Sequence, residues 1–397
     1  MTEGSYILVL NGGSSSLKFA LFKDNEYNCV GRGIIAEIGK KARFSSKGEM
    51  FEGKTPPEVE GRCGSPGEAT ELLLAWLDTC LPPNALLAVG HRVVHGRDFK
   101  DHMIVRPHIL AYLKTQMPLA PLHQPFNVEV IDRATAMYPK VPQIACFDTA
   151  FHTTIPALHR RYAIPRIWEE KGVKRYGFHG LSYEYIAGRL KEVAPRAFNG
   201  NAVVAHMGNG ASLCALDHGK SFDTSMGFSV LEGLVMGTRP GNLDVGVLLY
   251  FMREAKLDEK AIERMLYHDS GLKGVSGITS DMSELLASQD PAAREAVDLF
   301  CLRATREISA FIGMLGGIDA IVFTGGIGEN ARPIRAQIAA SLSWVGVDLD
   351  EQKNAAADGK SEVLLTTPHS KVEVWLIPTN EEAVIARSAR KLAEAEG

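Results

Sequence analysis

The sequence predicts an α/β protein in which one supersecondary unit occurs twice, once in each half of the chain. The first copy is an apolar strand, a Gly-Ser turn and a second apolar strand, ILVLNGGSSSLKFALF over residues 7–22. The second copy, over residues 202–227, again runs from an apolar strand through a small-residue turn into further strands. Apolar strands that alternate with helical segments elsewhere support the same fold class.

Both turns carry groups that suit a phosphate. The first offers backbone N–H groups, the hydroxyls of Ser14 and Ser16 and the ammonium of Lys18, and its small residues allow close approach. The second, at 206–210, reads His-Met-Gly-Asn-Gly. An ordinary hairpin turn is the alternative for either segment alone, but two such loops facing each other across a cleft would suit a nucleotide kinase.

Composition limits the class of protein. A chain of 397 residues is long enough for two or three domains, and its net charge of −4 argues against nucleic acid as the main partner. No apolar run approaches the ~20 residues of a membrane span, and residues 1–10 do not resemble a signal peptide. The six cysteines form no CxxC pair, so we expect reduced core thiols in a cytoplasmic protein.

In the first half, residues 40–66 are polar and rich in Gly, Pro, Ser and Lys, which indicates a hairpin and loop. Ser65-Pro66 then predicts a helix start, and Pro82-Pro83 its end. A strand over 86–94, a helix over 126–137 and a strand over 141–148 follow.

The second half starts near Thr149. Asp290-Pro291 predicts the start of a long helix, and Gly316-Gly317 its end. Strands are expected over 320–324 and 372–378, and a C-terminal helix closes the chain.

Polar residues follow several of these strands, at the edge where open α/β sheets bind ligands. Arg92 lies inside a β run, where an arginine is costly to bury without an anion to hold; a structural salt bridge is the alternative. Asp148 ends its strand and could hold magnesium, orient an arginine or act as a base, or simply form a cap. His179, between an aromatic residue and a glycine, and Arg239, in a turn, are further candidates.

The segment GGIGENA over 325–331 contains G-x-G-x-x-A after a strand. A dinucleotide site would need an acidic residue ~20 positions later at the end of a second strand. Asp348 and Asp350 lie instead in a turn-like segment, so a glycine loop that contacts adenosine explains the residues as well. No P-loop motif occurs in the chain.

Together these segments resemble the acetate kinase family. The resemblance covers nearly the whole chain through ordered motifs: NGGSSSLKF, GHRVVHG, PLHQP, CFDTAFH, RYGFHG, AHMGNGAS, DTSMG, LEGLVMGTRPG, VFTGGIGEN and IPTNEE. It implies the superfamily of acetate and sugar kinases, heat-shock chaperones and actin. The expected fold is two ribonuclease-H-like domains, in which one βββαβαβα core occurs twice, once per domain, with an ATP cleft between them. The expected domains are residues 1–148 with 382–397, and residues 149–381.

The resemblance also implies roles for individual residues. Asn11 and Glu381 match the magnesium positions of the family. Arg92 and Arg239 match the arginines that hold the carboxylate and the moving phosphoryl group. His179 matches the histidine that hydrogen-bonds the phosphoryl oxygens in the transition state.

Asp148 matches the acidic residue near metal and arginine, and with Arg92, His179 and Arg239 it completes the expected catalytic set. The residues expected to bind the carboxylate are Arg92, Val94, Leu122, His123, Phe178 and Val230. The residues expected to bind ATP are Ser14, Ser16, Lys18, His206, Met207, Gly208, Asn209, Gly210, Asp281, Met282, Ser283, Gly325, Gly326, Ile327, Gly328, Glu329 and Asn330.

The chain departs from the usual motifs without losing a matched catalytic residue. These departures bear on the shape of the acyl pocket and on nucleotide preference. The departing residues are Arg97, Gln124, Leu181, Tyr183, Val230, Pro240, Asn242 and Ser283.

The resemblance implies reversible phosphoryl transfer from MgATP to acetate, with Mg²⁺, or Mn²⁺ in its place, and ATP and ADP as co-substrates. The implied partners are a small carboxylate, a nucleotide and a second copy in a homodimer, with no nucleic acid and no membrane. Propionate is the alternative acceptor. An ATP-gated binding module of the same superfamily, without phosphoryl transfer, is the alternative from another class, and a dehydrogenase is a weaker one.

Overall fold

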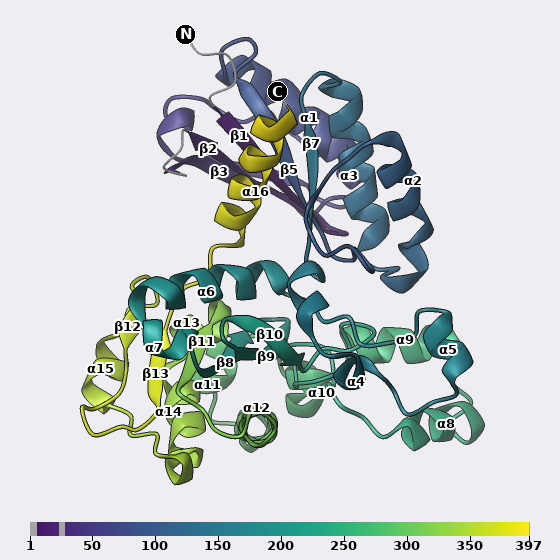
Figure 1. Ribbon diagram of the computed structural model, residues 1–397. Helices are drawn as coiled ribbons and strands as arrows, with labels where there is room; N and C mark the ends of the chain where they lie inside the picture. The colour runs from purple at the N-terminus through teal and green to yellow at the C-terminus, as the bar shows by residue number, and fades with distance from the viewer. Residues whose placement is uncertain (1–5, 24–27, 397) are drawn as a thin grey trace. The chain divides into compact units, whose positions relative to one another are not determined.

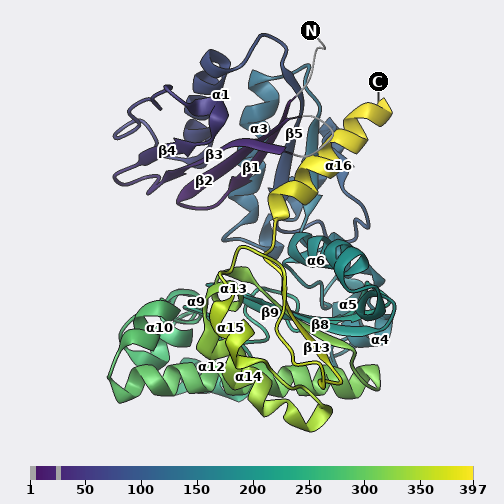
Figure 2. The ribbon, with the colours of Figure 1, turned by 90° about the vertical axis from the view of Figure 1, so that its left-hand side faces the viewer.

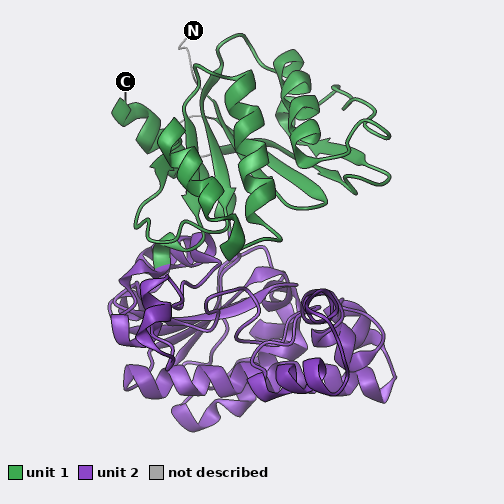
Figure 3. Ribbon diagram, turned by 90° about the vertical axis from the view of Figure 1, so that its right-hand side faces the viewer, with its two compact units in different colours: residues 1–151, 380–397 green, residues 152–379 purple. Residues whose placement is uncertain are grey.

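The computed structural model describes residues 6–23 and 28–396, so residues 1–5 of the segment considered for a signal peptide lie outside it. The chain divides into two compact units, which Figure 3 colours separately. Unit 1 comprises residues 1–151 and 380–397, and unit 2 comprises residues 152–379. The domain boundaries expected from the sequence, 148/149 and 381/382, remain predictions.

Unit 1 is built on a seven-stranded sheet of order β4-β3-β2-β1-β5-β7-β6. The strands are β1 (Tyr6–Gly12), β2 (Ser16–Lys23), β3 (Asn28–Ala36), β4 (Arg43–Lys47), β5 (Leu86–Val93), β6 (Met103–Ile104) and β7 (Gln143–Phe147). β1, β2 and β3 pair antiparallel, whereas β5 pairs parallel with both β1 and β7. The first predicted hairpin is therefore confirmed as β1–β2.

Helices cover both faces of this sheet. They are η1 (Glu49–Phe51), α1 (Pro66–Cys80), α2 (Pro107–Thr115), η2 (Met117–Leu119), α3 (Gln124–Met137) and α16 (Glu381–Glu396). Figures 1 and 2 show α16 on the face opposite α1 and α3. Ser65 caps α1 as expected, since its side chain accepts a hydrogen bond from the Glu68 N–H. Under α1, the rings of Phe19, Phe51 and Trp76 pack together.

Unit 2 has a six-stranded sheet of order β10-β9-β8-β11-β13-β12, which matches the order in unit 1 except that β4 has no counterpart among the described strands. The strands are β8 (Asn201–Met207), β9 (Ala211–Asp217), β10 (Lys220–Thr224), β11 (Ala320–Thr324), β12 (Val363–Leu364) and β13 (Glu373–Leu376). β8, β9 and β10 pair antiparallel, whereas β11 pairs parallel with β8 and β13. Three antiparallel strands followed by two parallel ones thus occur in both units, which confirms the duplicated α/β fold.

The remaining helices belong to the second half of the chain. They are η3 (Ala150–Thr154), α4 (Ala157–Arg160), α5 (Arg166–Glu170), α6 (Gly180–Val193), α7 (Pro195–Phe198), α8 (Val245–Arg253), α9 (Glu259–His268), α10 (Gly271–Ser276), α11 (Met282–Ala287), α12 (Pro291–Leu315), α13 (Gly325–Asn330), α14 (Arg332–Ser341), η4 (Ser343–Val345) and α15 (Glu351–Ala356). No helix of the described residues is long and apolar enough to span a membrane.

Two sequence expectations have clear outcomes here. The long helix is confirmed as α12, capped by the Asp290 side chain and ended by Gly316 in the left-handed conformation. The expectation of a glycine loop at 325–330 is wrong, because these residues form the short helix α13 directly after β11. Only Gly325, with a φ of 76°, keeps a conformation that favours glycine.

Close packing of α16 on β5 leads to a stability prediction. A Cβ atom on Gly90 would lie 2.5 Å from Cγ2 of Ile385 and 3.3 Å from Cβ of Ala389. We expect Gly90→Ala to destabilise unit 1 by about 1–3 kcal/mol through overpacking and to lower the melting temperature measured by calorimetry.

Gly188→Ala is the matched control. Gly188 lies in α6, where an added Cβ would meet no described atom within 4 Å other than its chain neighbours and the nearby backbone of its own helix. Alanine there should raise helix stability by about 0.5–1 kcal/mol. A Gly90→Ala protein as stable as the parent would contradict the packing of α16 on β5.

Candidate active site

In unit 1, the predicted catalytic and metal residues gather at the carboxyl ends of the parallel strands. Asn11 is the penultimate residue of β1, Arg92 lies near the end of β5, and Asp148 comes directly after β7. Glu381 is the first residue of α16, and His123 is the cap residue of α3. Parallel strands bring their carboxyl ends to one edge of a sheet, where ligands bind.

Arg92 and Asp148 form a bidentate ion pair. The Arg92 Nε–H donates to Oδ1 of Asp148 at 3.1 Å, and Nη2–H donates to Oδ2 at 2.7 Å. Glu381 lies near the same guanidinium, with Oε2 3.8 Å from Nε. The sequence allowed two interpretations of Arg92, a structural salt bridge and a residue that holds an anion. Both are compatible with this pair, because Asp148 binds Nε and Nη2 on one edge of the guanidinium and Nη1 can still donate to an anion.

The ion pair also shifts the pKa values of both its members. Burial opposes the charge on Arg92, but Asp148 and Glu381 outweigh it and raise the pKa of Arg92. Burial raises the pKa of Asp148, while Arg92 pulls it down and Glu381 raises it further. Because both Asp148 oxygens accept charge-assisted hydrogen bonds, we take the pair as ionised at neutral pH.

Two amide side chains of α3 form hydrogen bonds to the backbone at the ends of β1 and β5. The Asn127 Nδ2–H donates to the Gly12 carbonyl at 2.7 Å, and its Oδ1 accepts from the Val94 N–H at 3.0 Å. Gln124 accepts from the His95 N–H at 3.2 Å and donates to the His95 carbonyl at 3.0 Å. Gln124, a departure from the family motif, thus takes part in these hydrogen bonds, and Asn127 was missed by sequence reasoning.

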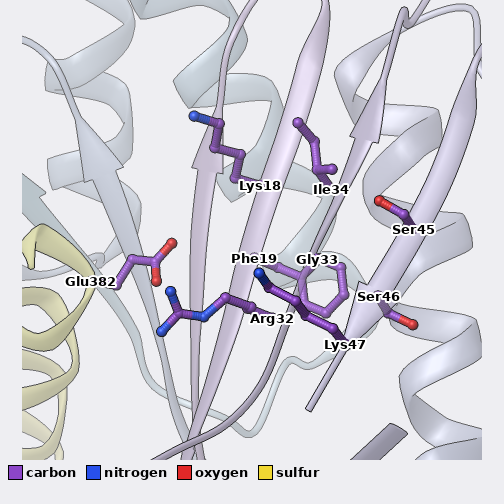
Figure 4. Close-up of a pocket in the computed structure, with 9 residues that line it drawn as sticks. All are labelled: Lys18, Phe19, Arg32, Gly33, Ile34, Ser45, Ser46, Lys47 and Glu382. Carbon is purple, nitrogen blue, oxygen red and sulfur yellow. The ribbon is translucent and has the colours of Figure 1, made fainter. Parts of the chain in front are cut away.

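The predicted phosphate ligand Lys18 lines a pocket of about 390 Å³ in unit 1. Figure 4 shows Lys18, Arg32 and Lys47 on adjoining strands, with Glu382 of α16 beside them. Burial raises the pKa of Glu382, and Arg32 and Lys18 oppose that shift. Arg32 and Lys47 were not expected from the sequence; they lie opposite each other on β3 and β4.

In unit 2, two predicted histidines stack. The rings of His179 and His206 lie 4.3 Å apart at an interplanar angle of 24°. His179 adopts the left-handed conformation, with φ 59°, at the start of α6. The carbonyl before it accepts a hydrogen bond from Nε2 of the buried His152 at 2.9 Å, which fixes the entry into the helix. Burial lowers the pKa of His152 to about 4, so this ring is neutral.

Arg239 has no carboxylate partner among the described residues. Its Nη1–H donates to the Val230 carbonyl at 2.7 Å, and burial lowers its pKa to about 10. A Cβ placed on Gly210 would lie 2.7 Å from Nη2 of Arg239 and 3.3 Å from Nε2 of His179. A guanidinium and an imidazole therefore converge beside one glycine of the second hairpin turn.

A pocket of about 520 Å³ in unit 2 is lined by residues from most of the predicted nucleotide segments. The predicted residues that line it are Gly208, Asn209, Asp281, Met282, Ser283, Gly326, Ile327 and Asn330. Sequence reasoning missed Ser280, Leu286 and Ala331, which follow or precede the motifs and carry no signal of their own. The predicted ATP-binding residues of unit 2 that lie outside this lining are His206, Met207, Gly210, Gly325, Gly328 and Glu329.

Glu329 supports the structure of these segments. Its Oε1 accepts from the Gly325 N–H at 2.9 Å and the Thr379 N–H at 3.0 Å, which ties the start of α13 to the segment after β13. At the other end of α13, the fully buried Arg335 donates to the Gly328 and Glu329 carbonyls. No sequence signal marked Arg335, because it lies in an ordinary amphipathic helix.

The predicted acyl residues divide between the units. Val94 and Leu122 lie in unit 1 near Arg92 and His123 in sequence, with Val94 buried and Leu122 half-buried. Phe178 is buried in unit 2, and Val230 is half-buried beside Arg239. Ser14 lies in the β1–β2 turn of unit 1 and Ser16 begins β2; the Gly13 N–H donates to the Ser16 carbonyl at 2.8 Å.

The chain is similar to known proteins over nearly its whole length. Residues 6–387 match the Acetokinase family. The chain belongs to this family. It is 47% identical to the acetate kinase of Rhodopseudomonas palustris and 44% identical to that of Methylocella silvestris, in each case over 98% of both chains.

Solved structures of family members have the same fold. Acetate kinase from Porphyromonas gingivalis superposes with a TM-score of 0.89 at 33% identity, covering 98% of this chain and 100% of that one. A propionate kinase from Francisella tularensis superposes with a TM-score of 0.90 at 36% identity, covering 98% and 99%. The family and fold implied by the motifs are thereby confirmed.

Proposed function

We propose that the protein catalyses reversible transfer of the γ-phosphoryl group of ATP to acetate, giving acetyl phosphate and ADP. The single observation that carries the proposal is Arg239. A half-buried guanidinium with no carboxylate partner in the described chain, beside an imidazole, is a site for an anion. Membership of a family whose relatives are acetate and propionate kinases supports the same substrates.

The proposed step is a direct in-line displacement. A carboxylate oxygen of acetate attacks the γ-phosphorus, a new P–O bond forms, the bond to the β-phosphate oxygen breaks, and ADP leaves. A carboxylate is already ionised near neutral pH, so no residue needs to remove a proton from it. What the protein must supply is stabilisation of negative charge, for which we propose the guanidinium N–H groups of Arg92, the net positive charge of Arg239 and an N–H of His179.

Mg²⁺ fits the oxygen donors of unit 1. Asn11 offers an amide oxygen and Glu381 a carboxylate, and Asp148 completes an oxygen-rich end of the sheet. The described residues contain no group of three or more His, Cys, Asp or Glu arranged to hold a metal. Magnesium typically takes one or two protein carboxylates together with substrate phosphates. Bound there, it would neutralise charge on the nucleotide, and Mn²⁺ would suit the same donors.

We place the protein in the cytoplasm as a homodimer. Helix α8, VGVLLYFMR, has no buried residue, and Val245 and Tyr250 are 72% and 59% exposed. A helix with so many large apolar side chains normally buries them, and a second copy of the chain is the partner we propose.

Arg239→Ala should collapse turnover, because an arginine on the transferring phosphoryl group is worth about 10³–10⁵ in rate. Arg92→Ala should act in the same direction. The measurement is the steady-state rate of acetyl phosphate formation, with Arg294→Ala as control because the Arg294 side chain is 86% exposed. Losses below about tenfold for both Arg92→Ala and Arg239→Ala would rule out these assignments.

The acceptor can be identified with a panel of formate, acetate, propionate and butyrate, trapping the acyl phosphate with hydroxylamine. We expect a Mg²⁺-dependent signal that is largest for acetate. Val230→Pro, which restores the usual family residue, should change the propionate-to-acetate ratio by at most about fourfold, the value of one buried CH₂. A maximum at propionate would favour the alternative acceptor.

No acyl phosphate with any acid, despite ATP binding, would contradict the kinase and favour the ATP-gated module. Binding of NAD instead of ATP would favour a dehydrogenase.

The dimer can be tested by analytical ultracentrifugation. Leu249→Asp combined with Tyr250→Asp should shift the sedimenting species from dimer to monomer, because charges would replace apolar contacts of α8. Trp344→Asp, at an exposed apolar residue of η4, should leave the dimer intact. A parent protein that sediments as a monomer would contradict the proposal.

A further inference from the structure

His179 is connected to Tyr183 through a buried serine hydroxyl. Nδ1 of His179 lies 2.9 Å from Oγ of Ser212, and the same Oγ lies 2.5 Å from the phenolic oxygen of Tyr183. Tyr183 and Ser212 are fully buried. Tyr183 is one of the departures from the family motif. It lies in α6, four residues or about one helical turn after His179.

The protons of this chain can be assigned on chemical grounds. A phenol is a stronger acid than an aliphatic alcohol and therefore the better donor, so the Tyr183 O–H donates to Ser212. The Ser212 hydroxyl then has its own proton to donate, and Nδ1 of His179 is its neighbour at 2.9 Å. An Nδ1 that accepts this proton carries none itself, which leaves the ring proton on Nε2.

We propose that Tyr183 and Ser212 are positioning residues that hold His179 as the neutral tautomer with its proton on Nε2. The proposal rests on the proposed function, in which His179 donates a hydrogen bond to a phosphoryl oxygen. Nε2 is the atom that converges with Nη2 of Arg239 beside Gly210, so the relay places an N–H where an anion would bind.

The surroundings of His179 favour a neutral donor over a second cation. Arg239 already brings a positive charge to the same spot, and it has no carboxylate partner in the described chain to offset it. The opposite tautomer would direct the Nε2 lone pair at phosphoryl oxygens, which repel it. The relay therefore keeps the donor while avoiding a like charge next to the guanidinium.

The stacked His206 has a parallel arrangement. Its Nδ1 lies 2.8 Å from Oγ of Ser182, which lies 2.8 Å from the Thr379 hydroxyl. Successive residues of α6, Ser182 and Tyr183, thus reach the Nδ1 atoms of the two histidines, one directly and one through Ser212. The ring of His152 packs edge-on against Tyr183 at 5.5 Å, which restricts the phenol to this direction.

The tautomer can be measured directly by NMR of ¹⁵N-histidine-labelled full-length protein at pH 8 without ligands, with the His179 signals assigned from His179→Gln. We expect the parent to show a protonated Nε2 and an unprotonated Nδ1 at His179. Ser212→Ala should shift this signal pair toward a mixture of tautomers, and Tyr183→Phe should do so more weakly. Tyr176→Phe is the matched control, because Tyr176 is equally buried and its hydroxyl donates to the Gly172 carbonyl, away from His179.

Kinetics then separate the relay from the proposed function. A wrong tautomer of a catalytic histidine can cost up to about 10⁴ in turnover. We expect Ser212→Ala to lower kcat about 100-fold, which lies between that limit and no effect. Tyr183→Phe should lower kcat about fivefold, because it removes one hydrogen bond. KM for both substrates should change little, because the ground-state contacts remain.

A protonated Nδ1 in the parent, or tautomers unaffected by Ser212→Ala, would overturn the relay whatever the activity. A tautomer change without loss of turnover would instead leave the relay standing and overturn the role proposed for His179. Equal loss of kcat in Tyr176→Phe would show a general packing effect and would also count against the relay.

Discussion

The parallel pairing of strands is the constraint on which the candidate site depends. In unit 1 the ends of β1, β5 and β7 lie side by side, and in unit 2 those of β8, β11 and β13 do. A side chain placed at the end of such a strand, or directly after it, therefore lies next to its counterparts from distant parts of the sequence. Arg92 meets Asp148 in this way across 56 residues. The hydrogen bonds of Asn127 to two of these ends keep them fixed.

This constraint explains why so much could be predicted from the sequence. Strand ends are marked by a change from apolar to polar residues, and helix starts by Ser65-Pro66 or Asp290-Pro291, so both hairpins and both capped helices were located. Segment 325–330 misled the prediction because its three glycines suggest a loop. Two side chains stabilise this helix: Glu329, within it, accepts from the Gly325 N–H at its start, and Arg335 of α14 donates to the Gly328 carbonyl near its end. Nothing in the glycine pattern marks these contacts.

Contacts between side chains were the least predictable part. The Tyr183–Ser212 bond joins residues 29 apart, and it depends on how α6 lies on the sheet rather than on any motif. The sequence marked Tyr183 only as a departure. The same holds for Arg239, which has no carboxylate partner among the described residues, since a sequence cannot show that no carboxylate lies near an arginine. In both cases the role of the residue depends on which side chains surround it, whereas the motif shows only which residue type is present.

The two arginines illustrate different ways of holding a charge ready for an anion. Arg92 is held by a carboxylate, which fixes its geometry but cancels its net charge, so that an incoming anion meets a neutral pair. Arg239 is held by a neutral carbonyl and keeps its full charge, at the cost that burial disfavours the charged form and lowers its pKa. An anion that binds Arg239 removes this penalty, whereas one that binds Arg92 competes with Asp148. The strongest differential attraction for a developing phosphoryl charge is therefore expected at Arg239, and the polarity of its neighbour His179 matters most there.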